Sequence, residues 1–313
     1  MATRLYVQEV AVRDGFQIEP AFVPTAKKIA LIDELSACGL AKIEVTAFVS
    51  PKAVPNLRDA EEVMRGIRRA PGVIYSALVP NVRGAQRALD GGVDEINLVM
   101  SASESHNRAN VNRSTEESLN GFGEVMQAVQ GRDVAVNGSL STSFGCPFEG
   151  AVPTERVLRF VERYLEFGMD GVTLADTTGM AHPGQVRELT HAVLARFPGI
   201  DLTLHFHNTR GMGLANVLAG LEAGALRFDA SLGGLGGCPF APGATGNICT
   251  EDLVHMLHAM GYVTGVDLDR LLRAARKLPD IVAHEVPGQV AKAGKITDLH
   301  PLPATARKES AQS

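Results

Sequence analysis

The sequence predicts an α/β fold, a single (β/α)8 TIM barrel with extra C-terminal helices. Short segments rich in β-branched residues alternate with longer helical patterns along the 313 residues, which is typical of repeated βα units. Eight strand-like and eight helix-like segments can be distinguished. They occupy roughly 250 residues, the usual size of a closed parallel barrel, so this fold is favoured over an open doubly wound sheet.

The expected strands, in chain order, are Leu5–Val10, Lys42–Thr46, Val73–Val79, Glu95–Val99, Val134–Ser139, Gly171–Ala175, Leu202–His205 and Arg227–Ala230. The helical patterns lie near 24–38, 57–70, 82–91, 114–130, 154–168, 183–197, 211–224 and 249–261. The first three of these helices end close to Gly or Pro, as helix stop signals should. Thr115 and Thr154 stand at helix starts with Glu next in sequence, where hydroxyl caps and acidic first turns are common.

The chain continues beyond the eighth unit. Residues 267–292 predict one or two more helices, and the polar end at 297–313 predicts a flexible tail. No linker rich in Pro or Ser divides the chain. We therefore expect one catalytic domain over residues 1–296, followed by the tail.

The composition argues against several classes of partner. With 30 Lys and Arg against 35 Asp and Glu, the net charge is −5, which offers no basic surface for nucleic acid or anionic lipid. No apolar run is long enough to cross a membrane, and no targeting segment is visible at the N-terminus. Four Cys are too few for a disulfide framework. We expect a cytoplasmic protein with reduced thiols and with neither nucleic acid nor membrane as partner.

Polar residues gather at the carboxyl ends of the expected strands, where such barrels place catalytic groups. They are Arg13 and Asp14, Glu44 and Thr46, Asn97, Ser139 and Ser141, Asp176 and Thr177, His205 and His207, and the loop Gly233–Asn247. Few of these residues are typical of barrel packing. They are the candidates for a functional site.

His205 and His207 give the sharpest local signal. Two residues apart on a strand, their side chains share one face, so both imidazoles could bind one cation at the barrel mouth. Asp14 could add an anionic ligand and Asn247 an amide oxygen. Nitrogen and oxygen donors of this kind suit Mg²⁺ or Mn²⁺, with zinc as the alternative if a thiolate joined them.

Arg13 and Glu44 allow a structural and a functional interpretation. Arg13-Asp14-Gly15 could be a surface ion pair that leads into a turn, or Arg13 could stabilise a developing oxyanion in the barrel mouth. Glu44 lies in the strand KIEVT, where a buried carboxylate is costly unless it is bonded or used. A hydrogen bond to Arg13 or to a backbone amide would satisfy it.

The segment SLGGLGGCPFAPGATGN (231–247) is rich in Gly, which favours a flexible loop that can lie close over a ligand. It fits neither a dinucleotide fingerprint nor a P-loop. Cys238 within it could be a reactive thiol or an inert small side chain. Asp176 is expected to hold a loop or cap a helix, and Cys146 and Cys249 are weaker candidates. His255 and His258, three residues apart, are expected on a solvated helix face.

Six segments resemble the 3-hydroxy-3-methylglutaryl-CoA lyase family. They are EVAVRDGFQIE (9–19), KIEVTAFVSPKAVPNL (42–57), GCPFEG (145–150), LADTTGMAHPG (174–184), LHFHNTRGMGLAN (204–216) and GLGGCPFAPGATGNICTEDLVHMLHAMG (234–261). The similarity runs in order and without large gaps from about Val7 to about Leu272. Its extent and order indicate the fold and the metal site more strongly than the substrate.

The resemblance implies a metal-dependent (β/α)8 barrel that assembles as a homodimer or a higher homo-oligomer. Carried over by motif, the ligands of Mg²⁺ or Mn²⁺ would be Asp14, His205, His207 and Asn247. Arg13 would be catalytic, Glu44 would lie beside the metal and act with it, and Cys238 would be the catalytic loop thiol. The implied reaction cleaves a tertiary 3-hydroxyacyl-CoA between C2 and C3 to acetyl-CoA and a keto acid such as acetoacetate.

Two segments depart from the family pattern. The motif that usually reads His-Cys-His-Asp-Thr-Tyr reads His-Phe-His-Asn-Thr-Arg at 205–210, and GSLSTSFGCPFEG (138–150) differs from the usual small-residue pattern. Both changes fall where the acyl part should lie. We expect Arg13, Thr177, Asn208 and Arg210 to contact the substrate. A related thioester such as citramalyl-CoA, or a 3-hydroxyglutaryl-CoA with a longer branch, stays open.

Three other functions would use the same barrel. A condensing synthase would join acetyl-CoA to a 2-oxo acid, but such enzymes typically carry extra C-terminal segments. An aldolase acting on a free 4-hydroxy-2-oxo acid would not need the CoA group. A catalytically silent binding barrel would have no reason to keep the full set of candidate residues. The lyase is favoured over all three.

Overall fold

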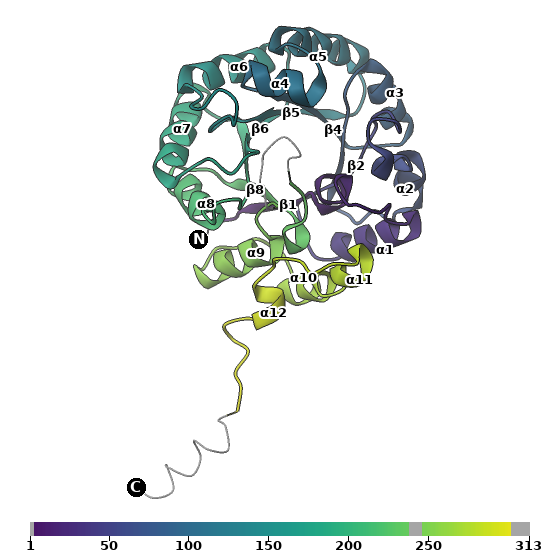
Figure 1. The fold of residues 1–313 in the computed structure, drawn as a ribbon, viewed down its shortest axis with the longest axis vertical. Helices are drawn as coiled ribbons and strands as arrows, with labels where there is room; N and C mark the ends of the chain where they lie inside the picture. Colours follow the sequence, from purple (N-terminus) through teal and green to yellow (C-terminus); the bar gives the residue numbers. More distant parts are fainter. Residues whose placement is uncertain (1–2, 238–245, 302–313) are drawn as a thin grey trace, which may run out of the picture.

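The computed structural model describes residues 3–237 and 246–301, and within them eight parallel strands close into a barrel. The strands follow one another in chain order, and β1 closes the barrel by pairing with β8 as well as with β2. Figure 1 looks down this barrel, with the strands around the centre and the helices outside them. The predicted fold class is confirmed.

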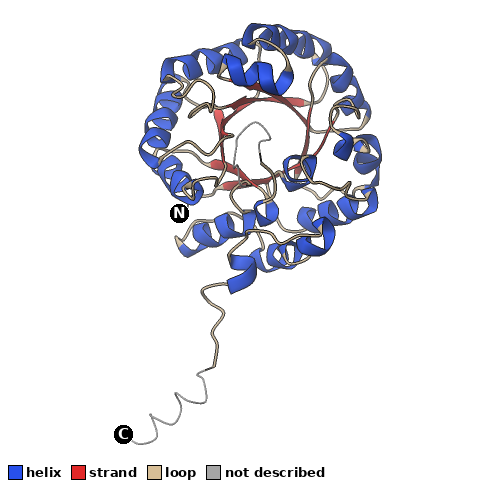
Figure 2. Cartoon of the chain, viewed as in Figure 1, coloured by secondary structure: helices blue, strands red, loops and turns tan. Residues whose placement is uncertain are grey.

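The strands are β1 (Tyr6–Glu9), β2 (Lys42–Ala47), β3 (Ile74–Leu78), β4 (Glu95–Ser101), β5 (Ala135–Ser141), β6 (Gly171–Asp176), β7 (Asp201–Phe206) and β8 (Arg227–Ala230). Each lies at an expected position. The helices that match the expected ones are α1 (Thr25–Ser36), α2 (Ala60–Gly66), α3 (Val82–Asp90), α5 (Thr115–Val129), α6 (Thr154–Glu166), α7 (Pro183–Arg196), α8 (Gly213–Glu222) and α9 (Thr250–Ala259). Figure 2 shows these helices as a continuous outer layer.

Two helical regions differ from the prediction. The short α4 (Glu104–Val111) was not expected, because its sequence ESHNRANV has no apolar periodicity; the side chain of Ser103 caps it by accepting from the N–H of His106. Residues 267–292 contain three helices rather than one or two: α10 (Leu268–Ala275), α11 (Leu278–Val282) and α12 (Val290–Ala293). Pro279 at the start of α11 and the left-handed Ala283 at its end divide this region.

Only the first residues of the expected tail, 297–301, fall within the described chain, and they form no helix or strand. None of the helices in the described residues is long and apolar enough to cross a membrane.

The interior of the barrel is polar, whereas its outer surface is apolar. In β7, Leu204 and Phe206 join the hydrophobic core beneath the helices, and the alternate residues Thr203 and His205 face inward. Thr203 accepts a hydrogen bond from Gln8 at 3.1 Å. Apolar packing against the helices thus holds the barrel together and leaves its interior free for chemistry.

A buried carboxyl group connects several chain segments where β1 and β8 pair. Glu9 is fully buried at the end of β1. Its Oε1 accepts from the backbone N–H groups of Ala11 at 2.8 Å and Leu232 at 2.9 Å, and its Oε2 accepts from Oγ1 of Thr250 at 2.8 Å. The turn after β1, the segment after β8 and the start of α9 are therefore attached to one side chain.

A second buried carboxyl group, that of Glu251 on α9, holds the same region. It accepts from the backbone N–H of Gly233 at 3.0 Å. Burial raises the pKa of Glu251 to about 8 and that of Glu9 to about 7, although the backbone donors partly oppose this shift. Both groups hold a proton over part of the neutral range.

The raised pKa of Glu251 predicts a pH-dependent stability. Between pH 4.5 and about 8 the folded chain keeps a proton that the unfolded chain has released, so the free energy of unfolding should fall as pH rises through this window. Glu251→Gln should weaken this decline, because an amide carries no charge to bury. Chemical denaturation at several pH values between 5 and 9 measures the difference between wild type and variant.

The matched control is Glu62→Gln, which changes an exposed residue on α2 in the same way. It should leave the wild-type slope of stability against pH intact. An equally steep decline in Glu251→Gln would contradict the assignment of the effect to Glu251.

Candidate active site

Arg13 and Asp14 lie on a single π-helical turn, η1 (Ala11–Gly15), directly after β1. The sequence predicted only a turn here, since no periodicity marks one turn of π-helix. Such turns are rare and occur often at functional sites. Gly15 allows the turn to pack closely, because a Cβ at this position would come within 2.8 Å of the Cβ of Leu235. The turn therefore lies against the segment that follows β8.

His205 and His207 lie at the end of β7, and a short backbone pairing brings Asn247 beside them. The N–H of Ile248 donates to the carbonyl of Phe206 at 3.1 Å, and the N–H of Asn208 donates to the carbonyl of Gly246 at 3.0 Å. His207 and Asn247 are opposite each other in this antiparallel bridge. Backbone hydrogen bonds thus hold the segment after β8 against the segment after β7.

Asp14, His205 and His207 form a group that can hold a metal ion. One ligand atom from each residue lies within 4.8 Å of the others. Asn247 joins the group through Asp14, because its Nδ2 donates to Oδ2 of Asp14 at 2.7 Å and to the carbonyl of Leu235 at 2.9 Å. Its buried Oδ1 accepts from no residue in the described chain. This unused amide oxygen beside a carboxylate and two imidazoles fits a divalent cation.

Gly236 makes room for this arrangement. Its φ of +104° lies in the region that favours glycine, and a Cβ there would come within 2.6 Å of Nδ2 of Asn247 and 3.0 Å of Oδ2 of Asp14. Any other residue would push these two side chains apart. The geometry of the site therefore requires a glycine at position 236.

Asp229 on β8 was missed by the sequence reasoning. Its Oδ1 lies 2.5 Å from Nδ1 of His205, and the two residues are register partners on neighbouring strands. This contact fixes the imidazole and leaves Nε2 for a ligand, as carboxylate partners of metal-binding histidines do. The signal in the sequence was an acidic residue inside the short strand RFDA, which only the barrel register connects to His205.

The charges of the site are balanced around Arg13. Its Nη1 donates to Oδ1 of Asp14 at 2.7 Å and its Nε donates to Oε2 of Glu44 at 2.5 Å. Burial opposes the positive charge, but the two carboxylates raise the pKa of Arg13 above its ordinary value. Burial likewise raises the pKa of Asp14, but Arg13 and the two imidazoles outweigh it and lower this pKa. Both groups are therefore ionised at neutral pH.

His205 belongs to the same balance. Burial lowers its pKa, but the carboxylates of Asp229 and Asp14 outweigh this and raise it above the ordinary value. Without a metal ion, the imidazole of His205 therefore holds its proton more tightly than an ordinary histidine does. A cation that binds there must displace this proton, which makes metal affinity fall with acidity.

Glu44 accepts a hydrogen bond from Arg13, which is one of the two partners that the sequence analysis expected for it. It is buried on β2, and a register irregularity between Glu44 and Thr46 interrupts the pairing with β3. Such bulges redirect side chains next to functional sites. Asn97 on β4 donates to Oε1 of Glu44 at 2.8 Å, so both carboxylate oxygens carry a donor.

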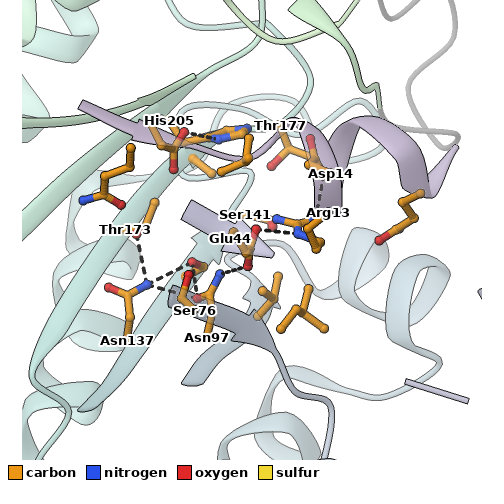
Figure 3. Close-up of a pocket in the computed structure, with 18 of the residues that line it drawn as sticks. Arg13, Asp14, Glu44, Ser76, Asn97, Asn137, Ser141, Thr173, Thr177 and His205 are labelled. Carbon is orange, nitrogen blue, oxygen red and sulfur yellow. Dashed lines mark hydrogen bonds and ion pairs between the residues drawn. The ribbon is translucent and has the colours of Figure 1, made fainter. Parts of the chain in front are cut away.

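These side chains surround a pocket of about 140 Å³ inside the barrel. Figure 3 shows Arg13 between Asp14 and Glu44, with Asn97 and Asn137 deeper in the pocket. Thr177 lines the pocket as well, and so do the polar residues Lys42, Ser76, Glu95, Ser139, Ser141 and Thr173. The pocket can therefore bind a small molecule with several oxygen atoms.

Other candidates lie elsewhere. Asn208 is exposed and accepts from the N–H of Gly213 at 3.1 Å, and Arg210 donates to the carbonyls of Thr178 and Gly179 at 3.1 and 2.8 Å. Neither is among the residues that line the pocket. In this structure both side chains fix the loops after β6 and β7.

Asp176 and the cysteines also have defined places. Asp176 accepts from the N–H groups of Met180 and Ala181 at 2.8 and 3.1 Å, which is the loop-holding role expected for it. Burial raises its pKa to about 6. Cys146 and Cys249 are buried free thiols, and neither is among the residues that line the pocket. Cys238 lies outside the described residues.

The ligand group predicts which variants lose metal. His205→Ala and His207→Ala should each abolish stoichiometric binding of Mn²⁺, because each removes one of the donors that converge. Isothermal titration calorimetry with Mn²⁺ measures this directly. His258→Ala, which removes an exposed imidazole on α9, is the control and should bind metal as the wild type does. Full binding by both site variants would refute the proposed ligand group.

A change at Asp229 should weaken metal binding without abolishing it. Asp229→Asn should keep the contact to Nδ1 of His205 but remove the charge, and it should weaken Mn²⁺ binding by about 10- to 100-fold. The same titration, run beside His205→Ala, places the variant between wild type and the ligand deletion. Wild-type affinity would mean that Asp229 does not support the ligand.

Comparisons with known proteins point to one family. The HMGL-like family model matches residues 4–278. The chain is 48% identical to the hydroxymethylglutaryl-CoA lyase YngG of Bacillus subtilis, over 91% of this chain and 96% of that protein. It is 45% identical to the mitochondrial hydroxymethylglutaryl-CoA lyase of Gallus gallus, over 86% of this chain and 90% of that protein.

A solved structure is similar over nearly its whole length. An HMG-CoA lyase from Acinetobacter baumannii, in complex with coenzyme A and 3-methylmalate, is 56% identical to this chain and superposes with a TM-score of 0.93. The similarity covers 96% of this chain and 98% of that one. The family match and the extent of these identities lead to one conclusion: this chain belongs to the hydroxymethylglutaryl-CoA lyase family.

Proposed function

We propose that this protein is a divalent-metal-dependent carbon–carbon lyase that cleaves 3-hydroxy-3-methylglutaryl-CoA to acetyl-CoA and acetoacetate. The observation that carries the proposal is the convergence of Asp14, His205 and His207 beside the Arg13 guanidinium in one polar pocket. Relatives that share 40–48% of their residues with this chain bear the name of this enzyme. An enzyme of this kind needs a cation site and an oxyanion donor side by side.

The cofactor is proposed to be Mg²⁺ or Mn²⁺, held by Asp14, His205, His207 and Asn247. When bound, such a cation supplies Lewis acidity that lowers the pKa of a substrate hydroxyl group. The mixed set of carboxylate, amide and imidazole donors suits these two ions. The Asp229 contact orients His205 for this purpose.

Arg13 is proposed to hold the thioester oxygen of the substrate. Its Nε and Nη1 are occupied by carboxylates, so the remaining guanidinium donors are those that can reach a ligand. As the bond between C2 and C3 breaks, the electron pair moves onto C2 and negative charge develops on the thioester oxygen. A fixed guanidinium stabilises this charge without reorganisation.

A water molecule takes the proton of the C3 hydroxyl group while the bond breaks, and the C3 fragment leaves as the ketone acetoacetate. The enolate of acetyl-CoA then gains a proton at C2, for which we propose the thiol of Cys238 as the donor, on the resemblance of its motif. Thr177 at the pocket wall is proposed to contact the acyl group, and Asn208 and Arg210 to shape the loops beside it.

A related substrate is the second candidate. The pocket is small and lined by hydroxyl and amide groups, and the Acinetobacter enzyme was captured with 3-methylmalate, a hydroxy dicarboxylate. A short thioester such as citramalyl-CoA therefore competes with the methylglutaryl compound. A long apolar branch is disfavoured, because it would leave the polar lining without partners.

A panel of CoA thioesters tests the proposal. Purified protein with Mn²⁺ should release acetyl-CoA from 3-hydroxy-3-methylglutaryl-CoA faster than from citramalyl-CoA or a longer-branched analogue. Prior treatment with a chelator should abolish turnover, and Mn²⁺ should restore it. Free acids without the CoA group should not react, which separates the lyase from an aldolase. No acetyl-CoA from any thioester would reject the function.

A second prediction concerns the turnover of an Arg13 variant. Arg13→Ala should keep the fold and bind Mn²⁺ but lower kcat by about 100- to 1000-fold, the usual effect of losing an oxyanion donor. Circular dichroism and metal titration check the first two points. Near-normal turnover would remove Arg13 from the mechanism.

We also propose a cytoplasmic location and a homodimer or higher homo-oligomer, on the resemblance and on the free thiols. Light scattering of the purified chain measures the mass of the assembly.

A further inference from the structure

Asn97 contacts both the pocket and the carboxylate that holds Arg13. Its Nδ2 donates to Oε1 of Glu44 at 2.8 Å, while Nε of Arg13 donates to Oε2 at 2.5 Å. Each oxygen of this buried carboxylate thus has its own donor. Since a buried carboxylate is costly unless it is hydrogen-bonded, the loss of one donor would change the position of Glu44.

The amide of Asn97 is held in one orientation. Its Oδ1 accepts from Nδ2 of Asn137 at 3.0 Å and from Oγ of Ser139 at 2.7 Å. If the amide were turned over, its oxygen would oppose the Glu44 carboxylate and its NH₂ group would face another NH₂ group. The neighbours on β5 therefore force Nδ2 of Asn97 toward Glu44.

Asn137 is fixed in its turn. It is the register partner of Asn97 on the adjacent strand, and its Nδ2 also reaches Oγ1 of Thr173 on β6 at 3.0 Å. The hydrogen bonds run from Asn137 to Asn97 and from Asn97 to Glu44, as Figure 3 shows. In such a chain each bond polarises and strengthens the next.

We propose that Asn97 is a positioning residue, which locks Glu44 so that Glu44 holds Nε of Arg13 and directs the other guanidinium donors into the pocket. This inference rests on the proposed function, in which Arg13 stabilises the enolate oxygen. It adds a role for a strand residue that reaches Arg13 through Glu44. The hydrogen bonds that orient Asn97 come from side chains on β5, and one of these, Asn137, is also bonded to β6.

Steady-state kinetics of Asn97→Leu test the role. Loss of a hydrogen bond to a charged group should lower kcat by about 10- to 100-fold. KM should stay within about threefold of the wild-type value, because a positioning residue acts on the transition state more than on the bound substrate. Mn²⁺ binding should be unchanged. A raised KM with wild-type kcat would mean a direct substrate contact and would overturn the proposal.

The matched control is Asn216→Leu. This residue is a buried asparagine on α8, whose Nδ2 donates to the carbonyl of Ala181 at 3.2 Å, and it is not among the residues that line the pocket. It should lose stability to a similar degree as Asn97→Leu but keep kcat. Equal losses of kcat in both variants would reduce Asn97 to a structural role.

Asn97→Asp provides a rescue that depends on pH. The introduced carboxyl group can donate to Glu44 only while the two groups share a proton. The ratio of the kcat of Asn97→Asp to the wild-type kcat, measured at the same pH, should therefore approach one at low pH and fall as pH rises. A pH profile parallel to that of the wild type would contradict the donor role.

A double-mutant cycle with Glu44→Gln separates this inference from the proposed function. The free energies of unfolding of the two single variants and the double variant should be non-additive, since the side chains are in contact. This measurement needs no activity. A wild type that cleaves no thioester would defeat the proposed function alone, whereas additive free energies would defeat the positioning role alone.

Discussion

The carboxyl group of Glu9 is the interaction on which the site depends most. It joins the turn that carries Arg13 and Asp14 to the segment after β8 and to the start of α9. In sequence, Leu232 lies 223 residues and Thr250 241 residues from Glu9. Only the closure of β1 against β8 brings them together. Without this anchor, the relative position of Asp14 and Asn247 would rest on the hydrogen bond between them and on the pairing of Asn247 with His207.

A second constraint is the balance of charge among side chains that are largely buried. Arg13 lies between the carboxylates of Asp14 and Glu44, and Asp229 accompanies His205. Each charge would be costly to bury alone, but together they neutralise one another. The same pairing that makes burial tolerable also orients the donors and ligands. Stability and chemistry therefore use the same hydrogen bonds, and a variant that breaks one of them should change both.

Much of the site followed from the positions of polar residues in the strand pattern. Arg13, Asp14, His205 and His207 follow or end their strands, Glu44 lies within β2, and the structure brings all five into one pocket. The residues that the pattern missed act through partners on other strands. Asp229 is recognisable only once β8 is in register with β7. The side chains of Asn208 and Arg210, which are expected to contact the substrate, form hydrogen bonds with nearby backbone groups.

The sequence alone determined the eight βα units, the order of the strands and the face on which His205 and His207 point, because these depend on local periodicity and on the alternation of side chains along a strand. Only the tertiary structure decided which side chains meet. The π-helical turn at Arg13, the contacts of Glu9 and the hydrogen bonds from Asn137 through Asn97 to Glu44 arise from the register between strands. Register is a property of paired segments, so no single segment encodes it.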